Sequence, residues 1–331
     1  MHVFSGVRLG AMVAFALAAL AQSEAPSKVW PEAFHKADKL LATKDYAGSR
    51  DVLAAALKTS PPSDTNCADA ALALLRIGSL DLDLGAFREA EKAYLSALPL
   101  WDKPNPPKLD RTLALMGLQM VYTRTGELTK AERFARQALL MREEALGPDS
   151  IELGAPLQNL AAVYQTERRY SEARDLFGQA IQIFERAGAN QSRGLAAARG
   201  NLAMLLADSG DFDGAIREAK AAVSIWQSAE ERYGPRLAIA LNVLADTECR
   251  AKRWKEAEES IRQAQEITVR LFGNRHPLLA PILRTYADVL EHTGHKREAR
   301  EMLRNADEIE HESSLTNLTG YTVDAETYRN K

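Results

Sequence analysis

The chain of 331 residues is 46% hydrophobic and 26% charged, so it can bury a sizeable core and is not a disordered tail. Its 42 basic and 45 acidic residues give a formal net charge of -3, and no long run of one sign occurs. Because phosphate recognition needs a concentrated basic face, this balance argues against nucleic acid as a partner. Two cysteines are too few for a disulfide scaffold.

Residues 1–21 have the pattern of a secretory signal peptide. Arg8 precedes an apolar run from Leu9 to Leu20, and Ala19 and Ala21 form a small-residue cleavage signal. The apolar run is shorter than the ~20 residues that a membrane-spanning helix needs. We expect cleavage after Ala21 and an exported chain, periplasmic or extracellular. The alternative is an uncleaved segment that anchors the chain, the one case in which we expect a membrane partner.

Alanine recurs along the chain at steps of 41 or 42 residues. The recurring positions are Ala56, Ala97, Ala138, Ala180, Ala222, Ala264 and Ala306. A second column, seven residues earlier in each unit, contains Ser49, Ala90, Ala131, Ala173, Ala215, Ala257 and Ala299. A third column contains Gly78, Gln119, Ala161, Ala203, Ala245 and Ala287. Spacing this regular identifies an internal repeat.

The stretch at 157–184 indicates that each repeat is a pair of helices. Leu160, Ala161 and Tyr164 follow helical spacing, and after a break so do Ala173, Phe177 and Ala180. Two helices joined by a short turn must cross closely, and a small residue on each helix permits that approach. The turns are predicted at four glycines, and two units carry another residue instead. The glycines are Gly85, Gly126, Gly210 and Gly294, and the replacements are Arg168 and Lys252.

The repeats divide the chain. We predict a degenerate helix pair at 24–59, six repeats over 67–308 and a polar, aperiodic tail at 309–331. Gln119 takes a position that is small in the other repeats, so we expect looser packing there.

The constellation of Leu160, Ala161 and Tyr164 followed by Ala173, Phe177 and Ala180 resembles the tetratricopeptide repeat family. The period of 42 and the linker LGPDS at 146–150 resemble its kinesin-light-chain-like subclass. The resemblance implies an all-α, right-handed superhelical solenoid of antiparallel helix pairs, with the first helix of each pair lining a concave groove.

The same resemblance implies which residues bind a partner. Residues shortly before the small first-helix position face the groove in the family, and an asparagine there holds the backbone of an extended peptide. The candidate residues are Gln158, Asn159, Asn201, Asn242, Arg124, Arg250 and Arg284. Asp208, Asp246, Asp288 and Glu291 on the same helices add acidic groups, so the groove is expected to carry mixed charge. Ordinary solvated surface residues are the alternative interpretation of the asparagines.

We find none of the standard catalytic or phosphate-binding motifs, and we expect no metal site and no small-molecule cofactor. The sequence therefore predicts an exported, non-enzymatic scaffold that binds a protein or an extended peptide in its concave groove. The alternative is a self-association module of a cell-envelope complex.

Overall fold

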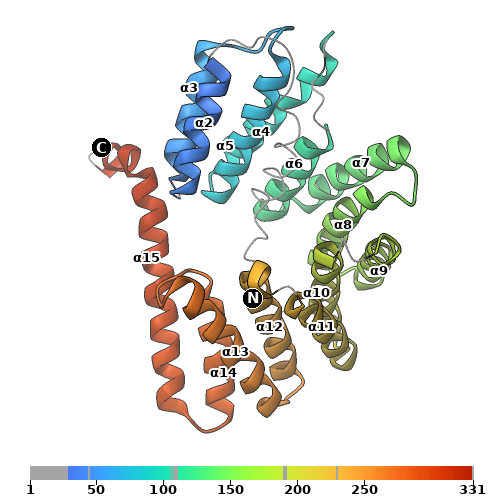
Figure 1. Cartoon of the computed structure of the whole chain (residues 1–331), viewed down its shortest axis with the longest axis vertical. Helices are drawn as coiled ribbons and strands as arrows, with labels where there is room; N and C mark the ends of the chain where they lie inside the picture. The colour runs from blue at the N-terminus through green and yellow to red at the C-terminus, as the bar shows by residue number, and fades with distance from the viewer. Residues whose placement is uncertain are drawn as a thin grey trace. The chain divides into compact units, whose positions relative to one another are not determined.

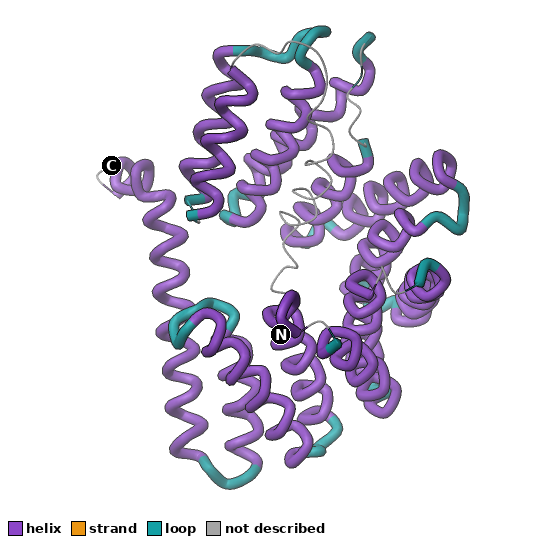
Figure 2. Tube along the Cα trace, in the orientation of Figure 1, coloured by secondary structure: helices purple, strands orange, loops and turns teal. Residues whose placement is uncertain are grey.

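A computed structural model describes residues 29–43, 45–104, 106, 111–188, 192–228 and 230–329. The predicted signal peptide at 1–21 lies outside these residues. The described chain contains helices and no strand, and the helices follow one another as antiparallel pairs (Figures 1 and 2). The prediction of an all-α solenoid of helix pairs is therefore confirmed. No helix in the described part is both long and apolar enough to cross a membrane.

The chain forms two compact units. The first contains the residues up to Ala145 and those from Asn317 onward, and the second contains Leu146–Thr316. Helices of the first unit are α2 (Val29–Ala42), α3 (Tyr46–Thr59), α4 (Cys67–Asp83), α5 (Phe87–Ala97), the 3-10 helix η1 (Leu98–Asp102), α6 (Thr112–Thr125) and α7 (Leu128–Leu146). Then follow η2 (Ile151–Leu153), α8 (Gly154–Thr166), α9 (Tyr170–Arg186), α10 (Ser192–Ser209), α11 (Phe212–Gln227), α12 (Glu230–Arg250), α13 (Trp254–Phe272), α14 (Leu279–His292) and α15 (Lys296–Arg329).

The recurring alanines lie at the helix crossings. Ala180 of α9 and Ala161 of α8 are completely buried, as are Ala97 and Ala138 in the first unit. Ser49 stands in place of the second alanine of its repeat, and its hydroxyl donates to the Ala37 carbonyl at 3.0 Å. The small residues therefore serve packing, as expected from close helix crossings.

The turns between paired helices use the left-handed backbone conformation. Gly85, Gly126 and their equivalents have φ values between 76° and 94°. Arg168 and Lys252 adopt the same conformation at φ 60° and 59°. The repeat geometry therefore imposes this conformation on side-chain-bearing residues too, although it costs them roughly 1–2 kcal/mol each.

Gln119 departs from the small-residue column without loosening the helix. Its side chain is buried, and its Nε2 donates to Thr123 Oγ1 at 2.9 Å. The close approach occurs two residues earlier, where a Cβ on Gly117 would lie 2.3 Å from Cζ of Tyr94. Helix α6 thus has its small residue two positions before the repeat column, and the close contact lies at Gly117 instead of Gln119.

The second unit has two layers of helices. The first helices of successive pairs pack on one another, α8 on α10, α10 on α12 and α12 on α14, while α9, α11 and α13 pack mainly between them from one side. The first helices therefore form one layer, whose other side is not covered by second helices. At the end, α15 continues to Arg329, whereas the sequence analysis placed a polar tail from residue 309. Ile309, 1% exposed, lies at the start of that predicted tail and is packed into the core.

Candidate partner-binding face

Each first helix of the second unit leaves one narrow strip open. Between Leu237 and Arg250 of α12, the residues that are not buried are Ile239, Asn242, Val243, Asp246 and Arg250. Their spacing of three or four residues keeps them on one side of the helix. The equivalent strips are Ala155, Gln158, Asn159, Ala162 and Thr166 on α8, then Ala197, Gly200, Asn201, Met204 and Asp208 on α10, then Pro281, Arg284, Thr285, Asp288 and His292 on α14. We call these four strips together the first-helix face.

The first-helix face has three rows that run across the helices. The row nearest the helix N-termini is apolar and contains Ala155, Ala197, Ile239 and Pro281. The middle row is dominated by side-chain amides and contains Gln158, Asn159, Gly200, Asn201 and Asn242. The row nearest the C-termini contains the uncharged Ala162, Thr166 and Met204 on α8 and α10, and elsewhere carries Asp208, Asp246, Arg250, Asp288 and His292. The face therefore changes from apolar through amide to charged along the helices.

Hydrogen bonding in the middle row is incomplete. Asn201 Nδ2 donates to Gln158 Oε1 at 3.0 Å, and Gln158 Nε2 donates to the Gly154 carbonyl at 3.2 Å. Among the described residues, Asn159 Nδ2 and Asn242 Oδ1 are buried atoms with no hydrogen-bond partner. A buried polar atom without a partner costs roughly 1–3 kcal/mol. The amide row thus retains one donor group and one acceptor that the fold does not use.

Gly200 has no side chain and leaves open space in the middle row. It lies 42 residues after Gln158 and 42 before Asn242, so it occupies the same repeat position on the helix between theirs. Apart from its chain neighbours and the nearby backbone of its own helix, no described residue has an atom within 4 Å of the place where a Cβ would stand. Glycine in a helix interior is unfavourable by roughly 0.5–1 kcal/mol relative to alanine. Packing therefore does not require glycine here, whereas close approach of a ligand would.

Arg250 joins two helices of the charged row. Its guanidinium donates to Asp208 Oδ1 at 3.0 Å and to the Ala207 carbonyl at 2.7 Å, and Gln165 Nε2 donates to the other oxygen of Asp208 at 2.7 Å. Arg250 thus partly neutralises Asp208, and its guanidinium already has partners within the chain.

Two further carboxylates remain in the charged row. Among the described residues, Asp246 has no hydrogen-bond or ion-pair partner, and Asp288 lies 3.2 Å from Nδ1 of His292. Asp246 is exposed, yet surrounding protein atoms displace part of its water and raise the pKa of its carboxyl. Asp288 and Asp208 raise this pKa further, against the opposing effect of Arg250. The carboxylates are therefore close enough to repel one another.

The structure brings six of the seven predicted residues together on the first-helix face, namely Gln158, Asn159, Asn201, Asn242, Arg250 and Arg284. The side chain of Arg284 is held by α15, where it donates to Asp307 at 2.7 Å and Glu310 at 2.8 Å. Arg124 belongs to α6 of the first unit and is exposed. Its relation to the other six is not defined.

The sequence analysis missed Ile239 as part of this face. The signal was present, since Ile239 is 42 residues from both Ala197 and Pro281. The open space at Gly200 could not be predicted from the sequence, because it depends on the neighbouring helices.

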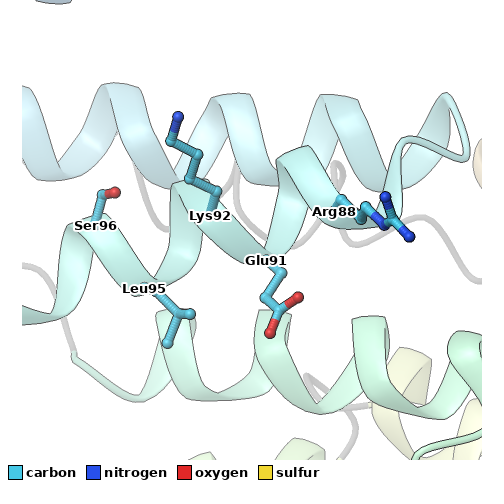
Figure 3. A pocket seen from close by; sticks show the side chains of 5 residues that line it. All are labelled: Arg88, Glu91, Lys92, Leu95 and Ser96. Atoms are coloured by element: carbon cyan, nitrogen blue, oxygen red, sulfur yellow. The ribbon is translucent and has the colours of Figure 1, made fainter.

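A separate shallow hollow lies on α5 of the first unit. Its lining comes from this one helix, namely Arg88, Glu91, Lys92, Leu95 and Ser96 (Figure 3). The close-up shows Lys92 pointing away from Glu91 and Leu95, so the lining side chains do not converge. The Tyr122 hydroxyl donates a hydrogen bond to Glu91 Oε1 at 2.5 Å, so this carboxylate already has a partner within the chain. This hollow lacks the unsatisfied groups that the first-helix face presents.

The described residues near the face include one cysteine and no grouped metal ligands. Cys249, buried directly behind it, has its pKa raised to about 12 by burial and by Asp288, so the thiol stays protonated and is a poor nucleophile. Within the described residues, no three His, Cys, Asp or Glu side chains are grouped to hold a metal ion.

The family model described as tetratricopeptide repeat matches residues 110–186, 194–268 and 236–306, more than half of the chain. The chain therefore belongs to the tetratricopeptide repeat family. No curated protein matches it. This family assignment, together with the fold, defines a protein–protein interaction scaffold.

Solved structures share the fold. A tetratricopeptide repeat protein from Parabacteroides merdae has a TM-score of 0.57 at 19% identity, over 89% of this chain and 99% of that one. A Rap protein complexed with competence and sporulation factor has a TM-score of 0.59 at 15% identity, over 97% and 92%. A putative kinesin light chain with nearly identical repeats from Podosopora anserina has a TM-score of 0.51 at 21% identity, over 61% and 96%. The resemblance to kinesin-light-chain-like repeats is thereby supported.

Proposed function

We propose that this chain is an exported scaffold that binds an extended segment of a protein partner across the first-helix face of its second unit. The observation that carries the proposal is the amide row around Gly200. Asn159 and Asn242 each keep a polar atom without a partner in the described structure, and Gly200 leaves open space between their helices. These features cost stability and need a reason outside the fold.

An extended peptide backbone supplies that reason. Each peptide unit presents one N–H and one C=O, and a side-chain amide offers both a donor and an acceptor in return. The unpartnered atoms of Asn159 and Asn242 are covered in the structure, so a rotation of each side chain toward the bound backbone would be needed to pair them. Gly200 would admit the backbone between the two amides without a side chain in the way.

The complex between a Rap protein and competence and sporulation factor gives this proposal further support. It is a protein of the same fold with a bound factor. The shared fold alone does not identify which residues hold a partner, so the assignment to the amide row depends on the geometry of the second unit.

The surface of the last helix disfavours the alternative function, in which copies of the chain assemble end to end. Asp307 and Glu310 of α15 stand 84 residues after Val223 and Trp226, which are buried in α11. At the terminal repeat these positions carry carboxylates paired with Arg284. A polar outer face of this kind is typical of a repeat that ends a solenoid.

A matched pair of glycine variants tests the proposed function. Random twelve-residue peptides displayed on phage are selected on the full-length chain, and bound peptides are then synthesised and titrated by fluorescence anisotropy. Gly200→Leu should weaken binding at least tenfold because the side chain fills the open centre of the amide row. Gly178→Leu, on α9, is the control, since a Cβ there also meets open space among the described residues.

Both substitutions replace a helix-interior glycine with a good helix former, so both variants should fold. If every selected peptide binds the Gly200→Leu variant as well as the original chain, the first-helix face is not the binding site. Mass spectrometry of the native protein tests export separately, since a mature chain beginning near Gln22 is expected.

A further inference from the structure

The charged row has a net negative charge once the internal pairs are taken into account. Asp208, Asp246 and Asp288 face one guanidinium, that of Arg250, which Asp208 and the Ala207 carbonyl already hold. Asp288 also lies 3.2 Å from Nδ1 of His292, a partner that carries charge only when it is protonated. Arg284 does not offset these carboxylates, because Asp307 and Glu310 bind it. The sequence analysis expected mixed charge here. The contacts leave the acidic groups of this row in excess.

The carboxylates stand where the helices themselves disfavour them. Asp208, Asp246 and Asp288 all lie within about the last turn and a half of α10, α12 and α14. The C-terminal end of a helix carries partial negative charge, which is unfavourable for a nearby anion. Asp246 also has no hydrogen-bond or ion-pair partner among the described residues to offset this cost. Neither packing nor pairing within the described fold therefore explains the unpaired carboxylate.

The opposite row is apolar. Ile239 in this row is 43% exposed, so a large part of its apolar side chain is open to a partner. Ala155, Ala197 and Pro281 extend this row over the other three helices. Along α12, Ile239 and Asp246 lie about 4.5 Å and about 6 Å from Asn242 on opposite sides, at 1.5 Å per residue.

An extended segment on the amide row would meet both outer rows. When its backbone N–H and C=O groups point at the amides, its side chains project sideways and alternate between the two flanks. Neighbouring helices pack 8–10 Å apart, so the path from α8 to α12 is roughly 16–20 Å, the length of about five or six extended residues. Alternate side chains would then reach the apolar row and the acidic row.

We infer that the bound segment is about six residues long and alternates apolar with basic side chains, with the lysine or arginine at its α12 end placed against Asp246 and reaching toward Asp288 on the adjacent α14. This inference rests on the proposed function and adds the chemistry of the partner. The charge of the row attracts the cation, and the exposed Ile239 covers an apolar side chain on the other flank.

The same phage selection tests this chemistry when the sequences of the bound peptides are determined. Peptides that require Gly200 should be enriched in lysine or arginine at alternate positions, with apolar residues between them. For such a peptide, the double variant Asp246→Asn with Asp288→Asn should lower affinity about three- to tenfold at 50 mM salt and much less at 500 mM.

The matched control changes two carboxylates outside the face. Asp175→Asn with Glu266→Gln, on α9 and α13, removes the same net charge from exposed positions on second helices. It should leave affinity within twofold, which separates contact with the charged row from general attraction to an acidic protein.

The outcomes distinguish the two proposals. Peptides that depend on Gly200 but show no basic enrichment, or bind the Asp246→Asn, Asp288→Asn variant unchanged, would overturn the inference about the partner and leave the proposed function standing. If no selected peptide depends on Gly200, both proposals fail.

Discussion

The two units insert an aromatic ring between the first helices of successive repeats in different ways. In the first unit, the ring of Tyr94 on α5 lies against Gly78 of α4 and Gly117 of α6, where added Cβ atoms would come within 2.8 and 2.3 Å of it. In the second unit, the ring of Phe184 on α9 lies against Gly154 of α8 and Gly194 of α10, with distances of 2.2 and 2.5 Å.

The difference lies in where the ring enters the helices. Tyr94 is 1% exposed and meets Gly117 in the interior of α6, whereas Phe184 is 7% exposed and meets Gly154 at the first residue of α8. A helix interior cannot move without breaking hydrogen bonds on both sides, while a first residue can shift with its linker. We therefore expect the contact between ring and glycine to tolerate substitution less well in the first unit than in the second.

Alanine substitution of the two tightest glycines tests this comparison most strongly. Gly117→Ala should lower the free energy of unfolding of the first unit by about 3 kcal/mol, because the new methyl group overlaps a fully buried ring. Gly154→Ala should cost the second unit about 1 kcal/mol, since the backbone there can adjust. Urea denaturation followed by circular dichroism measures both.

Gly178→Ala is the control for this series, because a Cβ at that position meets open space among the described residues. It should leave stability unchanged or raise it by up to about 1 kcal/mol, as helix propensity favours alanine. Equal losses for Gly117→Ala and Gly154→Ala would show that the location of the inserted ring does not matter.

Buried carboxylates at one repeat position provide a second comparison of the units. Asp81 of α4, 2% exposed, lies 3.5 Å from the Arg50 guanidinium, while its equivalent Glu248 of α12 accepts a hydrogen bond from Ser260 at 2.8 Å. Burial raises the pKa of Asp81 to about 6, and Glu89 and Asp51 add to this against the opposing effect of Arg50. Burial also raises the pKa of Glu248, whereas the Ser260 hydrogen bond opposes the rise.

The raised pKa predicts how stability depends on pH. The native state holds the Asp81 proton more tightly than the unfolded state does, so this carboxyl lowers stability as pH rises from about 4 to about 6. Asp81→Asn should therefore be more stable relative to the original chain at pH 7 than at pH 4, by about 2–3 kcal/mol. Thermal or urea unfolding across this pH range is the measurement.

Glu248→Gln is the matched variant in the second unit. We expect a smaller change between pH 4 and pH 7, because the Ser260 hydroxyl stabilises the ionised carboxylate. A larger change for Glu248→Gln than for Asp81→Asn would reverse the comparison.

The hydroxyl group of Tyr94 is the smallest difference between the two inserted rings, since Phe184 has none. It is a buried atom with no hydrogen-bond partner among the described residues. Tyr94→Phe removes it without changing the ring, so we expect a gain in stability of about 1 kcal/mol. A clear loss on urea denaturation would mean that the hydroxyl is satisfied in solution, by a water molecule for example.

The sequence determined the repeat and the role of its small residues. The alanine columns and the turn positions follow from a period of 42 residues. Each repeat is a helix pair formed by residues close together in the sequence, so the spacing of its apolar residues predicts it. The same period placed Gln158, Asn159, Asn201 and Asn242 on first helices, where the structure has them together. Local helical geometry is sufficient for both predictions.

Tertiary structure decided what each of these side chains does. Arg250 and Arg284 look alike in the sequence, but one joins two first helices through Asp208 and the other pairs with Asp307 and Glu310 of the last helix. Gly117 is needed because the Tyr94 ring from another helix lies where a Cβ would stand. At Gly200 no side chain of a neighbouring described helix fills that space. Such distinctions depend on contacts between helices that are far apart in the sequence, and a period within the chain carries no information about those distances.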